Sequence, residues 1–410
     1  MNIPCIKCKG SDPMHACGRS FCPIVAKSQA MFKVKPNIDK ESFSGSSPNV
    51  FIGHNFYPNL YVGILSPPER KEDAWVYDAP AKWASDNLQI PEIMNYRSAL
   101  INSRFRSHIK DQNKLLCLSK EIGLASKPVD IEINLKDKPH FRLSTDSYLA
   151  PMGPSASLLN ANLTENPRID SRVDKASSDT DLKANSALIY LYKKGFDENF
   201  LTKVLSTGNL GLKPQRKIVP TRWSITATDD AIAKHLLNEI KQYPQSDCLA
   251  YFGGYLGNYF LILLFPEIWS YELFENYAPN AEWNISTEFN YMTDNETYEG
   301  RKTYAENCGG GYYANRLAVL ENLSRIKRQA SVLTLRFITG EYAVPLGVWV
   351  VREASRKALS QKPIEFASKE LMLKYAEALV KKKFGYPLEN LLNKSVLLKS
   401  QKVQKKLTAY

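Results

Sequence analysis

The chain has 410 residues, 44% of them hydrophobic and 23% charged, which is the composition of a globular protein with two or three domains. No apolar run reaches about 18 residues and none follows a basic start, so we expect no membrane span, no cleaved signal peptide and a cytoplasmic location. The formal net charge is +12, and between Ser355 and Tyr410 thirteen lysines and arginines exceed four glutamates by nine. A basic C-terminal quarter suits a polyanionic partner such as DNA, although a solvated lysine-rich helix surface would have the same composition.

Four of the seven cysteines lie within the first 22 residues. They form two close pairs, Cys5 with Cys8 and Cys17 with Cys22. Two pairs on short turns supply the four thiolates of a closed tetrahedral site, so residues 1–25 are predicted to be a cysteine-rich unit with a structural Zn²⁺. His15 lies between the pairs and could replace one cysteine, and an iron–sulfur cluster could use the same four thiolates.

The first half of the chain alternates between polar stretches and short β-like segments. The Ser-Gly-Ser-Ser-Pro sequence at 44–48 is typical of a linker. The pattern then predicts strands at 50–53 and 60–65 around a turn, a helix within 91–124, a strand over 128–135 and a loop over 150–185.

The second half predicts both strands and helices. The expected elements are helices near 185–204, a strand around 217–226, a helix from Thr228 to about Tyr243, strands at 248–252 and 259–265, a helix over 312–329 and a strand over 332–338. From Leu346 the pattern is mostly helical. The chain is therefore predicted to have an α+β or α/β fold, with a mixed body over 49–345, a basic helical region over 346–400 and a disordered tail over 401–410.

Several aromatic residues stand beside cations, as in Arg222-Trp223. Such a pair can stack on unpaired bases, so Arg222 is a candidate DNA-binding residue. The more usual interpretation of such an aromatic side chain is packing in the core.

A carboxylate-rich segment follows the apolar strand at 259–265. Its candidate catalytic residues are Glu272, Glu275, Asp294 and Glu296. Nucleases use two or three carboxylates to hold Mg²⁺ or Mn²⁺ and activate water. The spacing here matches no metal-nuclease signature, and scattered acids commonly lie on surfaces.

Three glycines precede the helix predicted over 312–329, and arginines lie along it. Small residues at a helix N-terminus leave backbone N–H groups free to hold a phosphate. The candidate DNA-backbone contacts are Gly309, Gly310, Gly311, Arg316, Arg325 and Arg328. The alternative is a tight loop packed on the core, with the arginines on a solvated face.

The chain ends in Gln404-Lys405-Lys406-Leu407-Thr408-Ala409-Tyr410. This peptide resembles the motif by which proteins bind the sliding clamp PCNA, with Gln404, Leu407, Ala409 and Tyr410 at the motif positions. Its hydrophobic and aromatic residues fall on one side of a single 3₁₀ turn and enter a clamp pocket, while the glutamine forms a hydrogen bond. The usual second aromatic after Tyr410 is missing. The alternative is a frayed lysine-rich end with an incidental tyrosine.

Taken together, these features resemble the Nre family of archaeal DNA repair proteins, which joins a zinc-finger-like cysteine motif to a large body and ends in a clamp-binding peptide. The matching stretches include the four cysteines, Val50-Phe51-Ile52-Gly53, Tyr57-Pro58, Met152-Gly153-Pro154, Arg222-Trp223-Ser224-Ile225-Thr226, Gly257-Asn258, Gly309-Gly310-Gly311-Tyr312-Tyr313-Ala314 and Pro345-Leu346-Gly347-Val348-Trp349. The resemblance covers nearly the whole chain, and it implies a role in the response to DNA damage with PCNA as partner. It names no reaction.

Three hypotheses follow. The first is a DNA repair factor with a structural zinc site that binds the DNA backbone and is recruited by the clamp through its tail. The second is a metal-dependent nuclease or other DNA-modifying enzyme delivered by the same tail. The third is an adaptor that contacts the clamp and partner proteins but no DNA.

Overall fold

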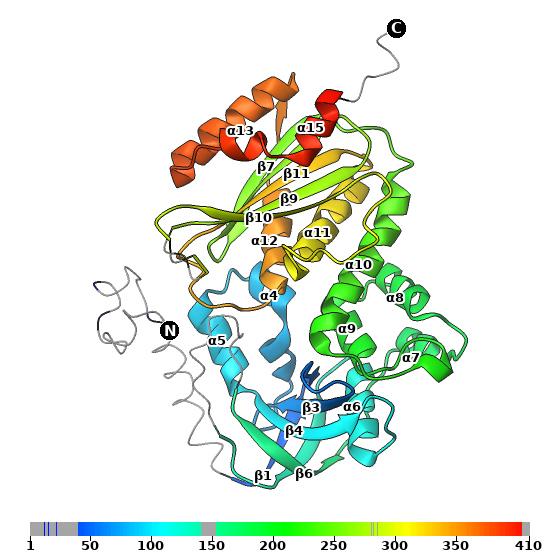
Figure 1. Ribbon diagram of the computed structural model, residues 1–410. Coiled ribbons are helices and arrows are strands. Elements are labelled where there is room, and N and C mark those ends of the chain that lie inside the picture. The colour runs from blue at the N-terminus through cyan, green and yellow to red at the C-terminus, as the bar shows by residue number, and fades with distance from the viewer. Residues whose placement is uncertain are drawn as a thin grey trace. The chain divides into compact units, whose positions relative to one another are not determined.

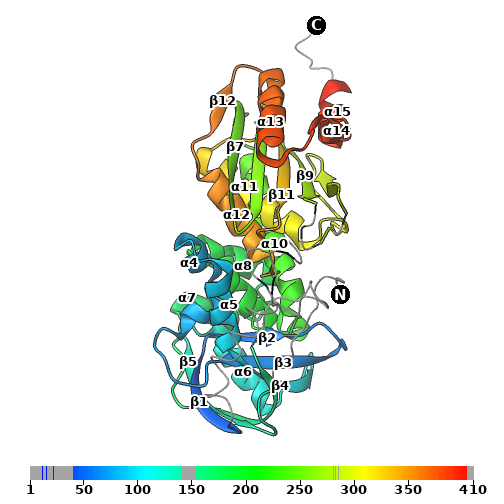
Figure 2. The same cartoon turned by 90° about the vertical axis from the view of Figure 1, so that its left-hand side faces the viewer.

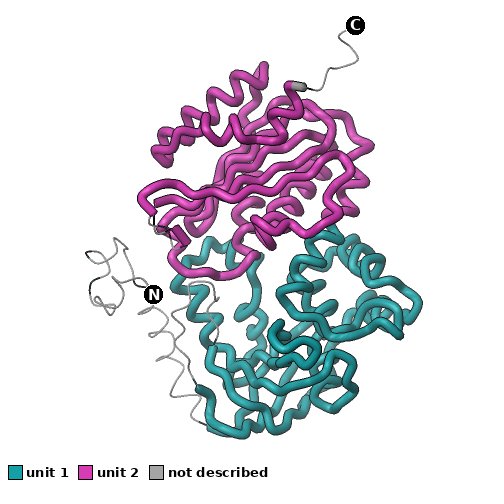
Figure 3. Tube along the Cα trace, in the orientation of Figure 1, with its two compact units in different colours: residues 1–232 teal, residues 233–410 magenta. Residues whose placement is uncertain are grey.

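The computed structural model describes residues 40–140, 153–279 and 286–403, together with residues 12, 15, 22, 281, 283 and 284. It divides into two compact units, residues 1–232 and 233–410, which Figure 3 colours separately. The division falls inside helix α10 (Thr221–Ile240), so the body expected over 49–345 contains residues of both units.

Unit 1 is built on a six-stranded sheet in the order β1-β5-β6-β4-β3-β2. Its strands are β1 (Ser42–Ser47), β2 (Asn49–Ile52), β3 (Asn59–Ser66), β4 (Ile101–His108), β5 (Val129–Leu135) and β6 (Ser155–Leu163). All neighbouring strands run antiparallel except β4 and β6, which are parallel. Figure 1 shows the sheet at the lower end of the cartoon.

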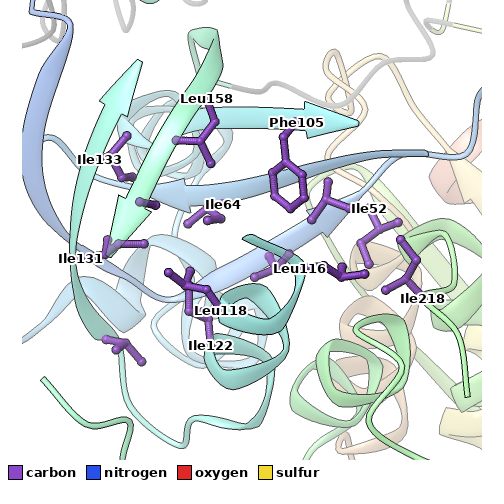
Figure 4. Packing of buried hydrophobic residues seen from close by; sticks show 14 of the residues in the cluster. Ile52, Ile64, Phe105, Leu116, Leu118, Ile122, Ile131, Ile133, Leu158 and Ile218 are labelled. Carbon is purple, nitrogen blue, oxygen red and sulfur yellow. The ribbon is translucent and has the colours of Figure 1, made fainter. Parts of the chain in front are cut away.

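One face of this sheet carries the core of unit 1. Strand residues at alternate positions, such as Ile64 and Phe105, point toward helix α6 (Lys114–Leu124), which contributes Leu116 and Ile122 (Figure 4). Each fully buried aliphatic side chain contributes about 1.5–3 kcal/mol, so the alternation fixes which face of every strand points inward.

Of the other helices of unit 1, the first three lie between β3 and β4 in sequence and the remaining four follow β6. They are η1 (Ala74–Asp78), α4 (Pro80–Ser85), α5 (Ile90–Ala99), α7 (Ser171–Ser178), α8 (Ala184–Lys193), α9 (Glu198–Ser206) and η2 (Lys213–Gln215). Side chains cap three helix starts: Asn113 accepts from the backbone N–H of Leu116, Asp170 from Arg172 and Asp197 from Phe200.

Unit 2 contains a second six-stranded sheet, in the order β10-β9-β11-β8-β7-β12. Its strands are β7 (Cys248–Tyr255), β8 (Asn258–Phe265), β9 (Ser270–Tyr277), β10 (Asn290–Glu296), β11 (Ser331–Ile338) and β12 (Ile364–Phe366). Strand β11 runs parallel to β9 and antiparallel to β8.

Helices cover both faces of the second sheet, as Figures 1 and 2 show. One face packs on α12 (Trp349–Leu359), which is paired with α11 (Gly310–Ile326), and Gly253 of β7 approaches the backbone of Ala358 there. The opposite face packs on α13 (Lys369–Phe384), α14 (Glu389–Leu392) and α15 (Val396–Val403). The mixed α and β class predicted from the sequence is therefore confirmed, as are the strands within 128–135, 248–252, 259–265 and 332–338 and the helix within 312–329.

Four local predictions were wrong. Residues 44–48 are largely part of β1 instead of a linker, and 150–185 contains β6 and α7 instead of one loop. Strand β4 interrupts the helix expected over 91–124, and the strand expected around 217–226 is the beginning of α10. In each missed strand small or polar residues face the core, such as Ser103 and Ala156, so the two-residue hydrophobic alternation was weak. Helix α10 begins directly after Pro220, and Pro220 accepts the backbone N–H of Trp223 and of Ser224.

Candidate nucleic-acid interface

The carboxylates proposed for metal chemistry lie on β9 and β10 and are all buried. Three of them are paired with arginines. Glu275 pairs with Arg336, Asp294 with Arg301 at 3.1 Å, and Glu296 with Arg316 at 2.8 Å. Burying a carboxylate is costly unless a cation and hydrogen bonds compensate it, and the arginines provide that compensation here.

Glu272 has a different partner. It accepts hydrogen bonds from the Ser395 hydroxyl and from the backbone N–H groups of Val396 (3.0 Å) and Leu397 (3.1 Å), at the start of α15. Burial raises the pKa of Glu272, and these hydrogen bonds oppose part of that rise. Glu272 thus caps α15 from a neighbouring strand. Across the described ranges, no three His, Cys, Asp or Glu side chains are placed to hold one metal ion.

The glycine-rich start of α11 is occupied by the protein's own carboxylates. Asp294 accepts the backbone N–H of Cys308 at 2.8 Å, and a Cβ at Gly311 would overlap the carboxylate of Glu275. Gly309, the residue before the helix, has a φ of +54°, in the left-handed region that favours glycine. The start of α11 is therefore packed against carboxylates of β9 and β10, at the place that was considered for a phosphate.

The arginines predicted along α11 differ in exposure. Arg316 is only 1% exposed and is held by Glu296, so it does not face solvent. Arg325 and Arg328 lie at the end of the helix, where Arg325 donates to the Asn322 side chain and Arg328 to the Lys327 carbonyl. Arg325 is exposed and Arg328 half-exposed, so both stay available to an anionic partner.

A group of exposed cations in unit 2 lies on α13 and α15. Helix α13 buries Met372, Ala376 and Val380 against the sheet, and this four-residue spacing turns the lysines at other positions outward. We define the lysine surface as the exposed lysines of α13 and α15: Lys374, Lys381, Lys382, Lys383, Lys399 and Lys402. Lys369, at the start of α13, is instead paired with Glu267 at 2.6 Å and with the Gln401 side chain at 3.2 Å.

Comparison with known proteins gives the same family for both ends of the chain. Residues 16–284 match the family model described as Archaeal Nre, N-terminal, and residues 296–410 match Archaeal Nre, C-terminal. The chain belongs to the Nre family.

Relatives of this Nre chain match over most of their length. The chain is 38% identical over 325 residues to the DNA repair protein NreA of Haloferax volcanii, which covers 77% of each chain. Identity is 35% over 376 residues to the DNA repair protein NreB of Archaeoglobus fulgidus (92% of this chain and 93% of the relative). It is 37% over 387 residues to the DNA repair protein NreA of the same organism (93% and 95%). No solved structure matches the chain.

Two of the predicted sites lie outside the described residues of this Nre chain. Of the four N-terminal cysteines only Cys22 is described, with a half-buried side chain, and the tail from Gln404 to Tyr410 is not described at all. Among the residues that are described, no helix is both long and apolar enough to cross a membrane.

Arg222 and Trp223 are exposed in the first turn of α10, as the DNA-binding interpretation requires. The Trp223 ring lies 5.5 Å from that of Tyr57, in the turn before β3, between centroids. The sequence did not single out two further exposed residues of the same unit, Tyr61 of β3 and Arg106 of β4, which are directly opposite each other. The missed signal was the alternation of Arg104, Phe105 and Arg106, which puts one side chain in the core and two outside.

Proposed function

We propose that this Nre chain is a DNA repair protein that contacts duplex DNA through the lysine surface while its last seven residues bind the sliding clamp PCNA. The names of all three relatives, DNA repair protein NreA or NreB, support the process. The observation that carries the DNA contact is the outward row of lysines on α13 and α15. None of the ion pairs in the described part of the chain involves these six lysines, so their charge is available to phosphates.

The lysine surface and the C-terminal peptide are neighbours in the sequence, which supports a combined contact with DNA and the clamp. Helix α15 ends at Val403, and the clamp-binding peptide begins at Gln404. A sliding clamp encircles duplex DNA, so a tail bound to it would keep the lysines just before it close to the phosphate backbone. In the peptide, Leu407 and Tyr410 would fill the clamp pocket, Gln404 would form the hydrogen bond, and the small Ala409 would fit beside them.

The N-terminal unit has a separate role in this proposal. Cys5, Cys8, Cys17 and Cys22 would hold a structural Zn²⁺ that orders a segment too short for its own core. The exposed Arg325 and the half-exposed Arg328 would add to the DNA-backbone contact.

The DNA contact is tested by charge removal. The variant Lys381→Gln/Lys382→Gln/Lys383→Gln should bind a labelled duplex more weakly and with a shallower dependence on salt. The reason is that fewer phosphates are neutralised, so fewer counterions are released on binding. The matched control is Lys136→Gln/Lys175→Gln/Lys193→Gln, which removes three exposed lysines of unit 1 and changes the net charge equally. Equal loss in both variants would show a general charge effect and contradict a DNA contact at the lysine surface.

The clamp contact is tested with the full chain and purified clamp. Leu407→Ala/Tyr410→Ala should abolish retention on immobilised PCNA, and Lys405→Gln/Lys406→Gln, which keeps both apolar side chains, should retain it. Undiminished retention of the Ala variant would refute the tether.

The nuclease alternative predicts that labelled branched DNA is cut in Mg²⁺ or Mn²⁺ and that Asp294→Asn or Glu272→Gln abolishes cutting. The pairing of these acids with Arg301 and with the start of α15 favours a structural role for them instead.

A further inference from the structure

Unit 1 carries exposed aromatic rings interleaved with cations. Four rings and four cations come from the β2–β3 turn, from β3 and β4, from the segment before α10 and from the first turn of α10. We define this aromatic–arginine surface by Phe56, Tyr57, Tyr61, Trp223, Arg104, Arg106, Lys217 and Arg222.

The sheet explains part of this surface. Tyr61 of β3 is directly opposite Arg106 of β4, and Gly63 is opposite Arg104. Their neighbours Val62 and Phe105 point into the core, so the pleat sends Tyr61 and both arginines to the outer face. Arg106 lies 5.6 Å from the centre of the Tyr61 ring and Arg104 lies 5.7 Å from it.

The turn before β3 adds two rings. Phe56 is 65% exposed and has a φ of +68°, a conformation that is costly for a bulky residue. Its ring contacts Tyr61 edge-on at 6.3 Å between centroids, and Arg106 lies 5.5 Å from it. The unfavourable backbone conformation of Phe56 is therefore not offset by burial of its side chain. Such strained residues are common at binding sites.

Helix α10 completes the surface. Trp223 is 48% exposed, and its ring lies 5.5 Å from that of Tyr57 between centroids. The Lys217 ammonium lies 3.3 Å from the Tyr57 hydroxyl, and Arg222 stands exposed beside the tryptophan. The fold of unit 1 thus brings together rings and cations that are far apart in the sequence.

The charge of this surface indicates its partner. In the described part of the chain, Arg104 and Arg106 stack on rings and take part in none of the ion pairs. Exposed rings can stack on bases, and guanidinium groups can hold the phosphates between them. A duplex keeps its bases stacked on one another, so only an unpaired strand can offer base faces to these rings.

We propose that the aromatic–arginine surface binds single-stranded DNA by stacking bases on Tyr61, Phe56 and Trp223. This inference deepens the proposed function, because it assigns the unpaired strand of a repair intermediate to unit 1 and the duplex to the lysine surface. An interface for another protein is the competing assignment. Among the described residues none of the four cations is in an ion pair with a carboxylate, which favours the polyanion.

The test measures binding of the full chain to a labelled 20-nucleotide thymidine strand and to a duplex of equal length. Tyr61→Ala and Trp223→Ala should each weaken binding of the single strand by roughly 5- to 100-fold and change duplex binding much less. Tyr61→Phe and Trp223→Phe keep a ring and should restore most of the affinity. Trp75→Ala is the matched control, since Trp75 is also in unit 1 and is 46% exposed.

The outcomes separate this inference from the proposed function. Unchanged single-strand affinity in Tyr61→Ala and Trp223→Ala, or a loss no larger than in Trp75→Ala, overturns the stacking surface and points to a protein partner. Equal loss for strand and duplex overturns the assignment to unpaired DNA. The lysine variants described above test the duplex contact alone, so either proposal can fail while the other stands.

Discussion

Arg316 and Glu296 show how unit 2 keeps ionic groups inside its core. Both side chains are almost completely buried and their atoms meet at 2.8 Å. Each charge is stable there only because the other is present, so the pair behaves as a unit. The same holds for Arg336 and Glu275, which meet beside the first turn of α11.

Removing one partner of this pair should be strongly destabilising. Glu296→Gln leaves the Arg316 charge buried without its carboxylate, and we expect a loss of about 3–5 kcal/mol in the free energy of unfolding. Urea denaturation measures it. Glu69→Gln is the control, because Glu69 pairs with Lys71 on the surface and its loss should cost less than about 1 kcal/mol. Similar small losses in both variants would mean that the buried pair contributes no more than a surface one.

Lys203 of α9 is a buried cation that takes part in none of the ion pairs found within the described ranges. Its ammonium donates to the Ala125 carbonyl at 2.8 Å, and burial lowers its pKa to about 8, with Asp78 and Asp197 partly opposing that shift. A lysine in an unfolded chain has a pKa of about 10.4. Between about pH 8 and 10 the unfolded chain therefore keeps the proton that folded Lys203 has lost. Lys203 therefore destabilises the fold fully below pH 8, and this cost is relieved as the pH rises toward 10.

This sign gives a pH-dependent prediction. Relative to Lys203→Met, the wild-type free energy of unfolding should increase by about 2.5 kcal/mol between pH 7 and pH 10, from about 1.4 kcal/mol per pKa unit. Urea denaturation of both proteins at the two pH values measures the difference, in which the other titrating groups cancel. A difference that stays constant with pH would exclude the lowered pKa.

At the scale of elements, strand β9 and helix α15 are joined by Glu272. The carboxylate satisfies two N–H groups at the start of the helix and interacts with the positive end of its dipole. Because α15 directly precedes the last seven residues, this cap also determines how firmly the helix before them is held.

Weakening the cap should loosen α15 selectively. Glu272→Gln removes the charge and one accepting oxygen, and we expect about 1–2 kcal/mol less protection from hydrogen exchange for the α15 amides. The amides of α11 should keep their protection. Glu365→Gln, an exposed residue of β12, is the control. Unchanged exchange in α15 would mean that Ser395 alone caps the helix.

At the scale of the whole molecule, each unit has its own sheet and its own buried core among the described residues, and a cysteine-rich segment of 25 residues is too short for a core of its own. We therefore expect the metal to stabilise only residues 1–25. Metal analysis of protein purified without chelator should find one zinc per chain. A chelator should then remove the zinc without lowering the thermal unfolding midpoint of the rest of the chain by more than a few degrees. Global unfolding on chelation, or protein free of zinc and iron, would contradict this.

The sequence by itself determined the features that depend on neighbouring residues. The apolar strands β8 and β11, the helix α11 and the family are all recognisable from short stretches, because hydrophobic periodicity and motif spacing are local properties. The cysteine spacing and the terminal peptide are local patterns of the same kind, and they remain predictions.

Tertiary structure alone decided which distant residues meet. The acids in the sequence do not reveal that two of them pair with Arg316 and Arg336 and that a third caps the start of α15. For the same reason the sequence left Arg316 as a candidate for the surface. Tyr57 likewise meets Trp223 only because the β2–β3 turn and α10 are brought together by the fold. Ion pairing and ring contact depend on the distance between side chains in space. The hydrophobic alternation of a strand such as β4 is too weak to predict its place in the sheet, so these distances are set only once the whole sheet has formed.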